Sequence, residues 1–154
     1  MSQKQTGELP LASLILQLSR DQAHLYEKQF GMSQSRLMLL RELMQTGEIS
    51  QAELVLRLDM EGTLVTRFVK QMESAGLLTR RSDPRDNRFT LVTLTPAGEH
   101  VAQQMAVFTH TLEAQILEGF SEEVIATIRQ GLKQIQEKYS DLKEADSPTD
   151  PPPG

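Results

Sequence analysis

The sequence predicts a mainly α-helical fold, formally α+β because a small β-hairpin is inserted among the helices. Three observations predict this class. Apolar side chains recur at helical spacing along most of the 154 residues, as they do in helices that bury one face. Two β-rich runs, residues 77–81 and 89–94, flank a turn-prone loop over residues 82–88. Gly31, Gly47, Gly76 and Gly119 fall at the ends of these segments, where turns and caps favour glycine.

The chain begins with two expected helices. Leucines at helical spacing predict the first over residues 9–30, and Gly31 ends it. Ser33 is placed to cap the second helix, which continues to Gly47. Residues 48–49 follow, and we expect them to add a short strand to the later hairpin.

The next two expected helices are short and closely connected. Ser50 and Glu53 form a capping-box pattern, which predicts the N-terminus of a helix. After a tight connection at residues 59–62, another helix is expected over residues 63–74. Gly76 suits the left-handed conformation that commonly follows a helix end. Two short helices joined by such a turn make a helix-turn-helix unit.

The helix expected over residues 63–74 has two opposed faces. Successive residues advance about 100° around a helix. Its apolar residues therefore share an arc of about 140°, and they are Leu64, Val65, Phe68, Val69 and Met72. The opposite side carries hydroxyls and cations, namely Thr63, Thr66, Arg67 and Lys70. We expect the first face to be buried and the second to be exposed.

Two long helices are expected after the hairpin. Thr95 is placed as the N-cap of the first and Pro96 as its first residue, where proline is favoured. Gly119 interrupts the pattern, and Ser121 caps the last helix. The apolar stripes of both helices are close to coiled-coil seams. They comprise Val101, Met105, Phe108, Leu112 and Ile116, then Val124, Ile128, Leu132, Ile135, Tyr139 and Leu142.

These segments divide the chain into a central unit and flanking helices. Residues 33–95 form the central unit with its hairpin, or wing, and residues 9–32 and 96–143 form a flanking helical region, the candidate dimerisation region. Residues 1–8 are expected to be flexible, and residues 146–154, rich in proline and aspartate, are expected to be disordered. The flanking helices either fold back on their own chain or pair with a second copy, which would relate two central units by two-fold symmetry.

A cationic helix followed by a cationic hairpin is the layout of a winged helix-turn-helix that binds DNA. The expected DNA contacts are Thr63, Thr66, Arg67, Lys70, Arg85 and Arg88. Arg67 can form two hydrogen bonds to a guanine, and the threonines can contact a thymine methyl or a phosphate. Lys70 lies farther along the helix and is expected to contact phosphate. For the helix alone, the alternative is an ordinary amphipathic helix with a solvated basic face.

The loop between the β-rich runs contains two aspartates with different expected roles. Asp86 is expected to orient Arg88, or to hold the base of the wing, through a charge-assisted hydrogen bond; turn chemistry is the alternative. Asp83 precedes Pro84 and is expected to be a turn residue. Arg85 at the tip either enters a narrow minor groove or remains solvated.

The segment over residues 63–98 resembles the winged-helix core of the MarR family of bacterial transcription regulators. The matching parts are residues 63–67, 72–73, 76–78, the wing at 83–88 and the Leu-Thr-Pro-Ala-Gly exit at 94–98. Asp86 and Arg88 occupy the family's Asp-x-Arg positions, whereas Asn87 stands where the family often has a second arginine. The order and spacing of helical segments extend the resemblance over most of residues 9–142.

The resemblance implies an obligate homodimer that binds pseudo-palindromic double-stranded DNA. Repression is favoured over activation, because occluding a promoter requires no further contact. A cleft for a small-molecule effector is implied between the dimer helices and the central unit, with candidate walls at Leu14, Leu18, Leu37, Leu40 and Phe108. Ordinary core packing is the alternative for each of these positions. The alternative function is a winged-helix protein-interaction module with no DNA role.

Charge and composition narrow the function further. The net charge is −5, but residues 95–154 carry 4 basic and 10 acidic side chains, whereas residues 64–90 carry 6 basic and 3 acidic ones. The basic patch, and not the total charge, decides attraction to DNA. A polar start and short apolar runs predict a cytoplasmic protein without a membrane segment.

No catalytic or metal-binding pattern is present in the sequence. The chain has no cysteine, so disulfides and thiol chemistry do not arise. It contains no phosphate-binding loop and no hydrolase motif, and we expect neither an enzyme nor a cofactor. His24, His100 and His110 lack the spacing of metal ligands, and no metal site is expected.

Overall fold

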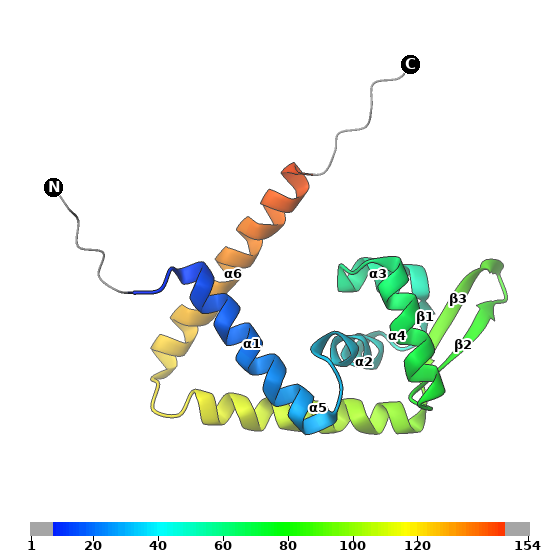
Figure 1. Cartoon of the computed structure of the whole chain (residues 1–154), viewed down its shortest axis with the longest axis horizontal. Helices are drawn as coiled ribbons and strands as arrows, with labels where there is room; N and C mark the ends of the chain where they lie inside the picture. The colour runs from blue at the N-terminus through cyan, green and yellow to red at the C-terminus, as the bar shows by residue number, and fades with distance from the viewer. Residues whose placement is uncertain (1–7, 147–154) are drawn as a thin grey trace, which may run out of the picture. The chain divides into compact units, whose positions relative to one another are not determined.

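The computed structural model describes residues 8–146, and Figure 1 shows its elements. In chain order these are α1 (Leu11–Phe30), α2 (Gln34–Thr46), β1 (Ile49–Ser50), α3 (Gln51–Leu58), α4 (Gly62–Ser74), β2 (Leu78–Asp83), β3 (Asp86–Leu94), α5 (Pro96–Ile116) and α6 (Glu122–Ala145). The predicted fold class, mainly helical with a small hairpin, is therefore confirmed. Most of the segments predicted as a flexible N-terminus and a disordered tail, residues 1–7 and 147–154, lies outside the described residues.

The chain divides into two compact units within α5. The first unit extends to Phe108 and the second begins at Thr109. The predicted helices are present, but α1 begins at Leu11 instead of residue 9, α5 ends at Ile116 and α6 continues to Ala145. These differences are small because fraying and capping set helix ends within one or two residues.

The three strands form one antiparallel sheet in the order β1-β3-β2. β1 pairs Ile49 with Val92 and Ser50 with Leu91 of β3. The short strand expected at residues 48–49 is therefore present, displaced by one residue. In Figure 1 the β2–β3 hairpin extends to one side of α4 as the wing.

The prediction of a loop over residues 82–88 is wrong, because the two strands continue through most of this segment. β2 reaches Asp83 and β3 starts at Asp86, which leaves Pro84 and Arg85 as the turn. The Asp83 carboxylate accepts the backbone N–H of Arg85 at 2.9 Å. An aspartate that bonds to the backbone two residues onward closes a tight turn, so the hairpin is longer than its turn-forming composition suggested.

Thr95 joins the end of the hairpin to the end of α4. Its hydroxyl donates to the carbonyl of Gly76 at 2.6 Å and accepts the backbone N–H of Gly98 at 3.1 Å. The second bond is the predicted N-cap of α5. Gly76 itself has a φ of 74°, the left-handed conformation expected after α4.

Two other predicted caps are only partly formed. The Ser50 hydroxyl accepts the backbone N–H of Glu53 at 3.1 Å, but the Glu53 carboxylate accepts from Arg57 at 2.9 Å in place of the return bond of a capping box. Ser33 was expected to cap α2 with its hydroxyl, and this is wrong. Its carbonyl accepts the backbone N–H groups of Arg36 and Leu37, whereas its buried hydroxyl has no partner among residues 8–146.

Gly98 lies where α5 passes close to the base of the hairpin. A Cβ atom at this position would be 1.9 Å from the carbonyl oxygen of Leu77, a separation that no side chain tolerates. The close approach of two backbones therefore requires glycine here.

The core of the first unit is formed by one face each of α2, α3 and α4 together with the sheet. Its fully buried side chains are Leu37, Leu39, Leu40, Leu43, Leu54, Val65, Val69, Met72, Leu78 and Val92. Four of the five residues of the predicted apolar face of α4 are thus buried, and Leu64 is half-buried. Burying this face fixes the rotation of α4 about its axis and turns its polar face outward.

Helix α1 is anchored to the first part of α5 through aromatic rings. Phe108 lies edge-on to Tyr26 and to Phe30, with ring centroids 5.1 and 5.5 Å apart, a favourable geometry for aromatic pairs. Along the rest of α1, large apolar side chains remain exposed, including Leu11, Leu14, Leu16 and Leu18.

The second unit also exposes an apolar stripe. Helix α6 has no buried residue. The exposed members of its predicted seam are Val124, Ile128, Leu132, Tyr139 and Leu142. Within this unit Arg129 pairs with Glu113 of α5 at 3.2 Å.

Candidate nucleic-acid interface

The polar face of α4 is exposed because the opposite face of the same helix lies in the core. Thr63, Arg67 and Lys70 are exposed, and Thr66 is half-buried. Within residues 8–146, neither Arg67 nor Lys70 forms an ion pair. Both cations are therefore available to an anionic partner.

Arg67 lies against an aromatic ring of its own helix. Its guanidinium carbon is 5.6 Å from the ring centroid of Phe68, within the range of a cation–π interaction. Arg36, from the first turn of α2, lies 5.7 Å from the same centroid. Arg36 was not among the predicted site residues, because no local pattern near the start of α2 indicates a contact with α4.

A side chain from α3 also reaches the polar face of α4. The Gln51 amide Nε2 donates to the Thr66 hydroxyl oxygen at 2.7 Å. From the sequence, the start of α3 was recognised only as a helix cap, and this contact was not predicted. The available signal was the helix-turn-helix pattern itself, which brings the start of its first helix close to the second.

The Asp86 carboxylate binds Arg88 in three ways. It accepts the backbone N–H of Arg88 at 3.1 Å, Nε at 3.0 Å and a terminal guanidinium nitrogen at 2.7 Å. The bonds from the guanidinium and then from the backbone hold the pKa of Asp86 below its ordinary value. Because 85% of the Arg88 side chain is exposed, the pair fixes the direction of an arginine that still faces solvent.

Asp83 and Arg85 form a second pair at the tip of the wing. The backbone N–H of Arg85, and then its side chain, lower the pKa of the Asp83 carboxyl. Asp83 is the buried member, whereas 86% of the Arg85 side chain is exposed. The structure therefore places Asp83 in the turn, as expected, and Arg85 at the exposed tip.

Arg80 and Arg81 carry less available charge than the sequence count suggested. Glu73, near the end of α4, accepts two bonds from Arg80 at 2.9 and 2.6 Å. Glu48 accepts two from Arg81 at 2.9 and 2.5 Å. These bonds lower the pKa of both glutamates. The two arginines hold the hairpin to neighbouring segments, and the freely available cations of this surface are those of α4.

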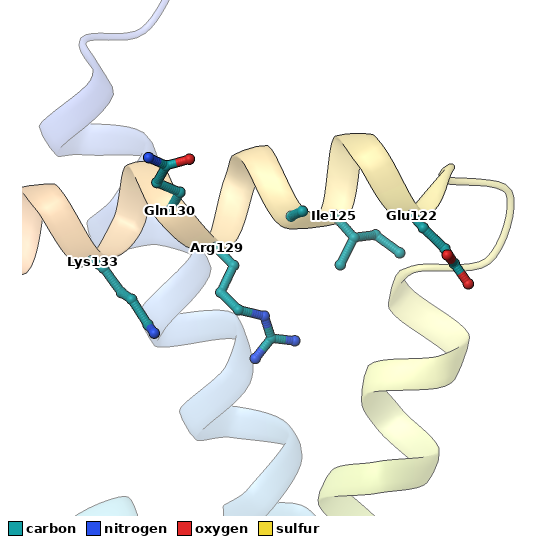
Figure 2. A pocket seen from close by; sticks show the side chains of 6 residues that line it. Glu122, Ile125, Arg129, Gln130 and Lys133 are labelled. Atoms are coloured by element: carbon teal, nitrogen blue, oxygen red, sulfur yellow. The ribbon is translucent and has the colours of Figure 1, made fainter.

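The five predicted effector residues lie in different surroundings. Leu37 and Leu40 are buried in the core of the first unit, Leu14 and Leu18 are exposed on α1, and Phe108 is half-buried in the aromatic cluster. A shallow hollow of about 390 Å³ runs along the first turns of α6 (Figure 2), and none of the five residues lines it. Its lining residues are Glu122, Ile125, Ala126, Arg129, Gln130 and Lys133.

The histidines do not gather at one place. His24, His100 and His110 are each exposed. Across the described residues, no group of three or more histidine or carboxylate side chains is arranged to hold a metal ion. In the same range, no helix combines the length and the hydropathy needed to cross a lipid bilayer.

The sequence matches one family of known proteins. Residues 32–90 match the sequence model of the MarR family. The uncharacterized HTH-type transcriptional regulator YdgJ of Bacillus subtilis is 36% identical over 118 residues, which span 72% of this chain and 72% of the relative. A second regulator of that organism, YwoH, is 32% identical over 94 residues, or 61% of this chain and 68% of the relative.

Solved structures match the fold. A probable transcriptional regulator from Pseudomonas aeruginosa has a TM-score of 0.73 at 25% identity and covers 82% of this chain and 96% of its own. MepR of S. aureus, solved in complex with DNA, has a TM-score of 0.75 at 20% identity and covers 86% of this chain and 99% of its own. Both Bacillus relatives are HTH-type transcriptional regulators. Given the exposed cationic helix α4, the wing whose arginines pair with carboxylates, and these relatives, the protein belongs to the MarR family of winged helix-turn-helix, DNA-binding transcription regulators.

Proposed function

We propose that this protein is a homodimeric repressor that binds a pseudo-palindromic double-stranded DNA site through α4 and the wing. The observation that carries the proposal is the exposed face of α4, where Arg67 and Lys70 have no carboxylate partner within residues 8–146. The wing adds two exposed arginines, Arg85 and Arg88. MepR of S. aureus and FabT of Streptococcus pneumoniae, both similar in fold, were each solved in complex with DNA.

The six candidate DNA contacts have distinct roles in this proposal. Arg67 reads a guanine edge in the major groove, and Thr63 and Thr66 contact a base edge or a phosphate. Lys70 and Arg88 bind phosphates and position the protein on the duplex. Arg85, at the wing tip, enters the minor groove. Asp86 contacts no DNA and keeps Arg88 in its binding direction.

A second copy of the chain would cover the exposed apolar side chains of α1 and α6. Burying a leucine-sized side chain contributes about 1.5–3 kcal/mol relative to leaving it exposed. On α1 and α6, nine apolar side chains of leucine size or larger are exposed. Leaving this surface in water is therefore costly. A two-fold dimer would present two copies of α4 to two half-sites of one DNA.

Release by a small molecule completes the proposal. A structure of BpsR from Bordetella bronchiseptica, which has a TM-score of 0.71 at 19% identity, concerns regulation of its DNA binding by 6-hydroxynicotinic acid. For this chain, Leu14, Leu18, Leu37, Leu40 and Phe108 remain the candidate effector contacts. Phe108 is the most informative of them, because its ring joins α1 to α5 within the first unit, and a ligand that displaces it would alter that junction.

The test is selection of bound duplexes from a random DNA pool, followed by sedimentation of the protein with and without the selected duplex. We expect an inverted repeat with half-sites about one helical turn apart, bound by two chains. Salt-dependent binding without any enriched sequence would contradict sequence-specific recognition. Absence of binding at low salt would instead favour a protein-interaction module. Adding the selected site between a promoter and a reporter then tests repression.

A further inference from the structure

We propose that Gln51 is a positioning residue for DNA recognition, which holds the Thr66 hydroxyl so that its hydrogen points to an acceptor on the DNA. The inference rests on the proposed DNA-binding function and adds a residue outside α4 to its reading surface. The contact that carries it is the 2.7 Å hydrogen bond from Gln51 Nε2 to Thr66 Oγ1.

Both ends of this hydrogen bond are fixed by the surrounding structure. Gln51 is the first residue of α3, whose start is held by the Ser50 cap. Thr66 lies next to Val65, which is fully buried and sets the rotation of α4. Between the helices, Asp59 adopts a left-handed backbone with a φ of 51°, which fixes the connection. The bond is therefore formed before DNA arrives.

Thr66 differs from other hydroxyl residues within the helices of this chain. Four of them donate to the carbonyl four residues earlier, namely Thr46, Ser74, Thr127 and Ser140. Such back-bonding is common for serine and threonine in helices. Thr66 does not do so, and within residues 8–146 its hydroxyl hydrogen has no acceptor. Thr66 instead accepts a hydrogen bond from Gln51 and keeps its own hydrogen free to donate.

The chemistry of a hydroxyl then determines what Thr66 offers to DNA. A hydroxyl has one hydrogen to donate and two lone pairs to accept with. Gln51 occupies one lone pair as a donor, which leaves the hydrogen unused at a half-buried site on the reading face. The matching DNA group is an acceptor, either a phosphate oxygen or an acceptor atom on a base edge. The phosphate oxygen and the base-edge atom both accept a hydrogen bond from the Thr66 hydroxyl in the same way.

The test is a set of double-mutant cycles measured on the selected duplex and on a scrambled duplex. Thr66→Val removes the hydroxyl at constant shape, and Gln51→Met removes the amide at similar length. We expect each single variant to weaken binding to the selected duplex about five- to tenfold, the value of one hydrogen bond. The double variant should be no weaker than the weaker single variant, because the two residues act as one unit.

Thr66→Ser supplies the matched background. Gln51→Met should weaken binding in the Thr66→Ser protein as much as in the parent, and should have no effect in the Thr66→Val protein. Losses confined to the selected duplex identify a base edge as the acceptor, and equal losses on both duplexes identify a phosphate; either result supports the positioning role. Thermal melting of each variant shows whether folding is intact.

Two results would overturn the inference. Losses that add in the double variant would show that Gln51 contacts DNA by itself. A Gln51→Met protein that binds as tightly as the parent, beside a weakened Thr66→Val protein, would show that Thr66 needs no positioning. If the parent protein binds neither duplex, the proposed function itself fails, and that outcome is visible before any variant is measured.

Discussion

Arg67 and Lys70 are one turn apart on the same face of α4, but their side chains suit different parts of DNA. The planar guanidinium of Arg67 can discriminate a guanine, whereas the Lys70 ammonium is a point charge. We predict that Arg67→Ala costs about 1–3 kcal/mol on the selected duplex and much less on a scrambled one. Lys70→Ala should weaken both about equally and reduce the salt slope by about one contact.

Titration of both variants at several salt concentrations checks this prediction. The two proteins act as controls for each other, because each loses one cation from the same helix face. Equal losses of Arg67→Ala on the two duplexes would assign Arg67 to phosphate binding. Sequence reading would then fall to the threonines or to DNA shape.

The Asp86–Arg88 pair gives a prediction in which electrostatics and geometry disagree. Arg88→Ala removes a cation, so weaker binding is expected on either view. Asp86→Ala removes a negative charge, which simple electrostatics expects to strengthen DNA binding. Because the Asp86 carboxylate holds both the backbone and the guanidinium of Arg88, we predict that Asp86→Ala weakens binding.

Binding curves for the two wing variants should be compared with Asp141→Ala, which removes an exposed carboxylate from α6. That control should bind DNA as the parent does or slightly more tightly. Tighter binding by Asp86→Ala than by the Asp141→Ala control would refute an organising role for Asp86.

For individual residues, features set by neighbouring residues in the chain could be predicted from the sequence, whereas contacts between distant residues could not. The two faces of α4 follow from helical periodicity, and the cations on its polar face were found in this way. The Gln51–Thr66 and Arg81–Glu48 contacts join residues 15 and 33 positions apart. They depend on how α3 crosses α4 and on where the hairpin returns, and neither is set by a local pattern. For this reason the count of basic residues overstated the available charge.

Among the glycines of the described helices, Gly98 at the start of α5 has the least room for a side chain. A Cβ at Gly98 would meet the Leu77 carbonyl at 1.9 Å, and a backbone atom cannot move aside as a flexible side chain would. We predict that Gly98→Ala destabilises the protein by about 1–3 kcal/mol, the usual cost of overpacking. Urea unfolding measures this difference directly.

Gly62 provides the control for Gly98. An added Cβ at Gly62, in the first turn of α4, meets nothing within 4 Å. Gly62→Ala should therefore leave stability unchanged or raise it, since alanine favours helix over glycine. If both variants unfold at the same urea concentration, then α5 and the hairpin separate easily and the close approach is not a constraint.

The link between α4 and β2 should depend on pH. Arg80 lowers the pKa of Glu73 from its ordinary value of 4.5. A carboxyl with a lowered pKa contributes stability above its unfolded value, and this contribution disappears as pH falls through the folded value. Glu73→Gln should thus be less stable than the parent at about pH 7, and the difference should shrink as the pH falls below 4.5.

Urea midpoints of the two proteins across this range test the prediction. The effect is expected to be small, because both members of the pair are only half-buried and solvent screens their interaction. Glu42→Gln is a useful comparison, since Glu42 pairs with Arg57 away from the hairpin. A midpoint difference for Glu73→Gln that stays constant at every pH would show that the link is steric and not ionic.

The elements themselves were largely predictable, and the errors have identifiable causes. Apolar spacing, together with capping patterns such as the one at Ser50, located all six helices of the described chain. The hairpin turn was misjudged because Ser, Asp, Pro and Asn are common in loops, whereas a single Asx bond lets strands continue through them. The prediction that the Ser33 hydroxyl caps α2 was wrong, because residue type alone does not show where a hydroxyl points.

For the whole molecule, the exposed apolar stripe of α6 leads to a prediction about assembly. Sedimentation at low micromolar concentration should give about twice the chain mass of 17.3 kDa. Leu132→Asp introduces a charge into the stripe, and in a two-fold interface the change occurs twice. We predict that it raises the dimer dissociation constant by about 100-fold or more.

Gln134→Asp is the matched control for assembly, because residue 134 lies on the side of α6 opposite Leu132. It adds the same charge and should remain dimeric. A parent protein that sediments as a single chain and still binds the selected duplex tightly would refute the dimer. If both variants remain as dimeric as the parent, the interface does not include the apolar stripe of α6.

The internal pairing of the wing arginines has a consequence for how the protein searches a genome. All four arginines of the hairpin, Arg80, Arg81, Arg85 and Arg88, already have a carboxylate beside them. Contact with arbitrary DNA therefore releases few counterions through the wing, and release of counterions is the main source of non-specific affinity. We expect short visits to the wrong sequence and rapid exchange between sites, with long residence only where α4 finds its bases.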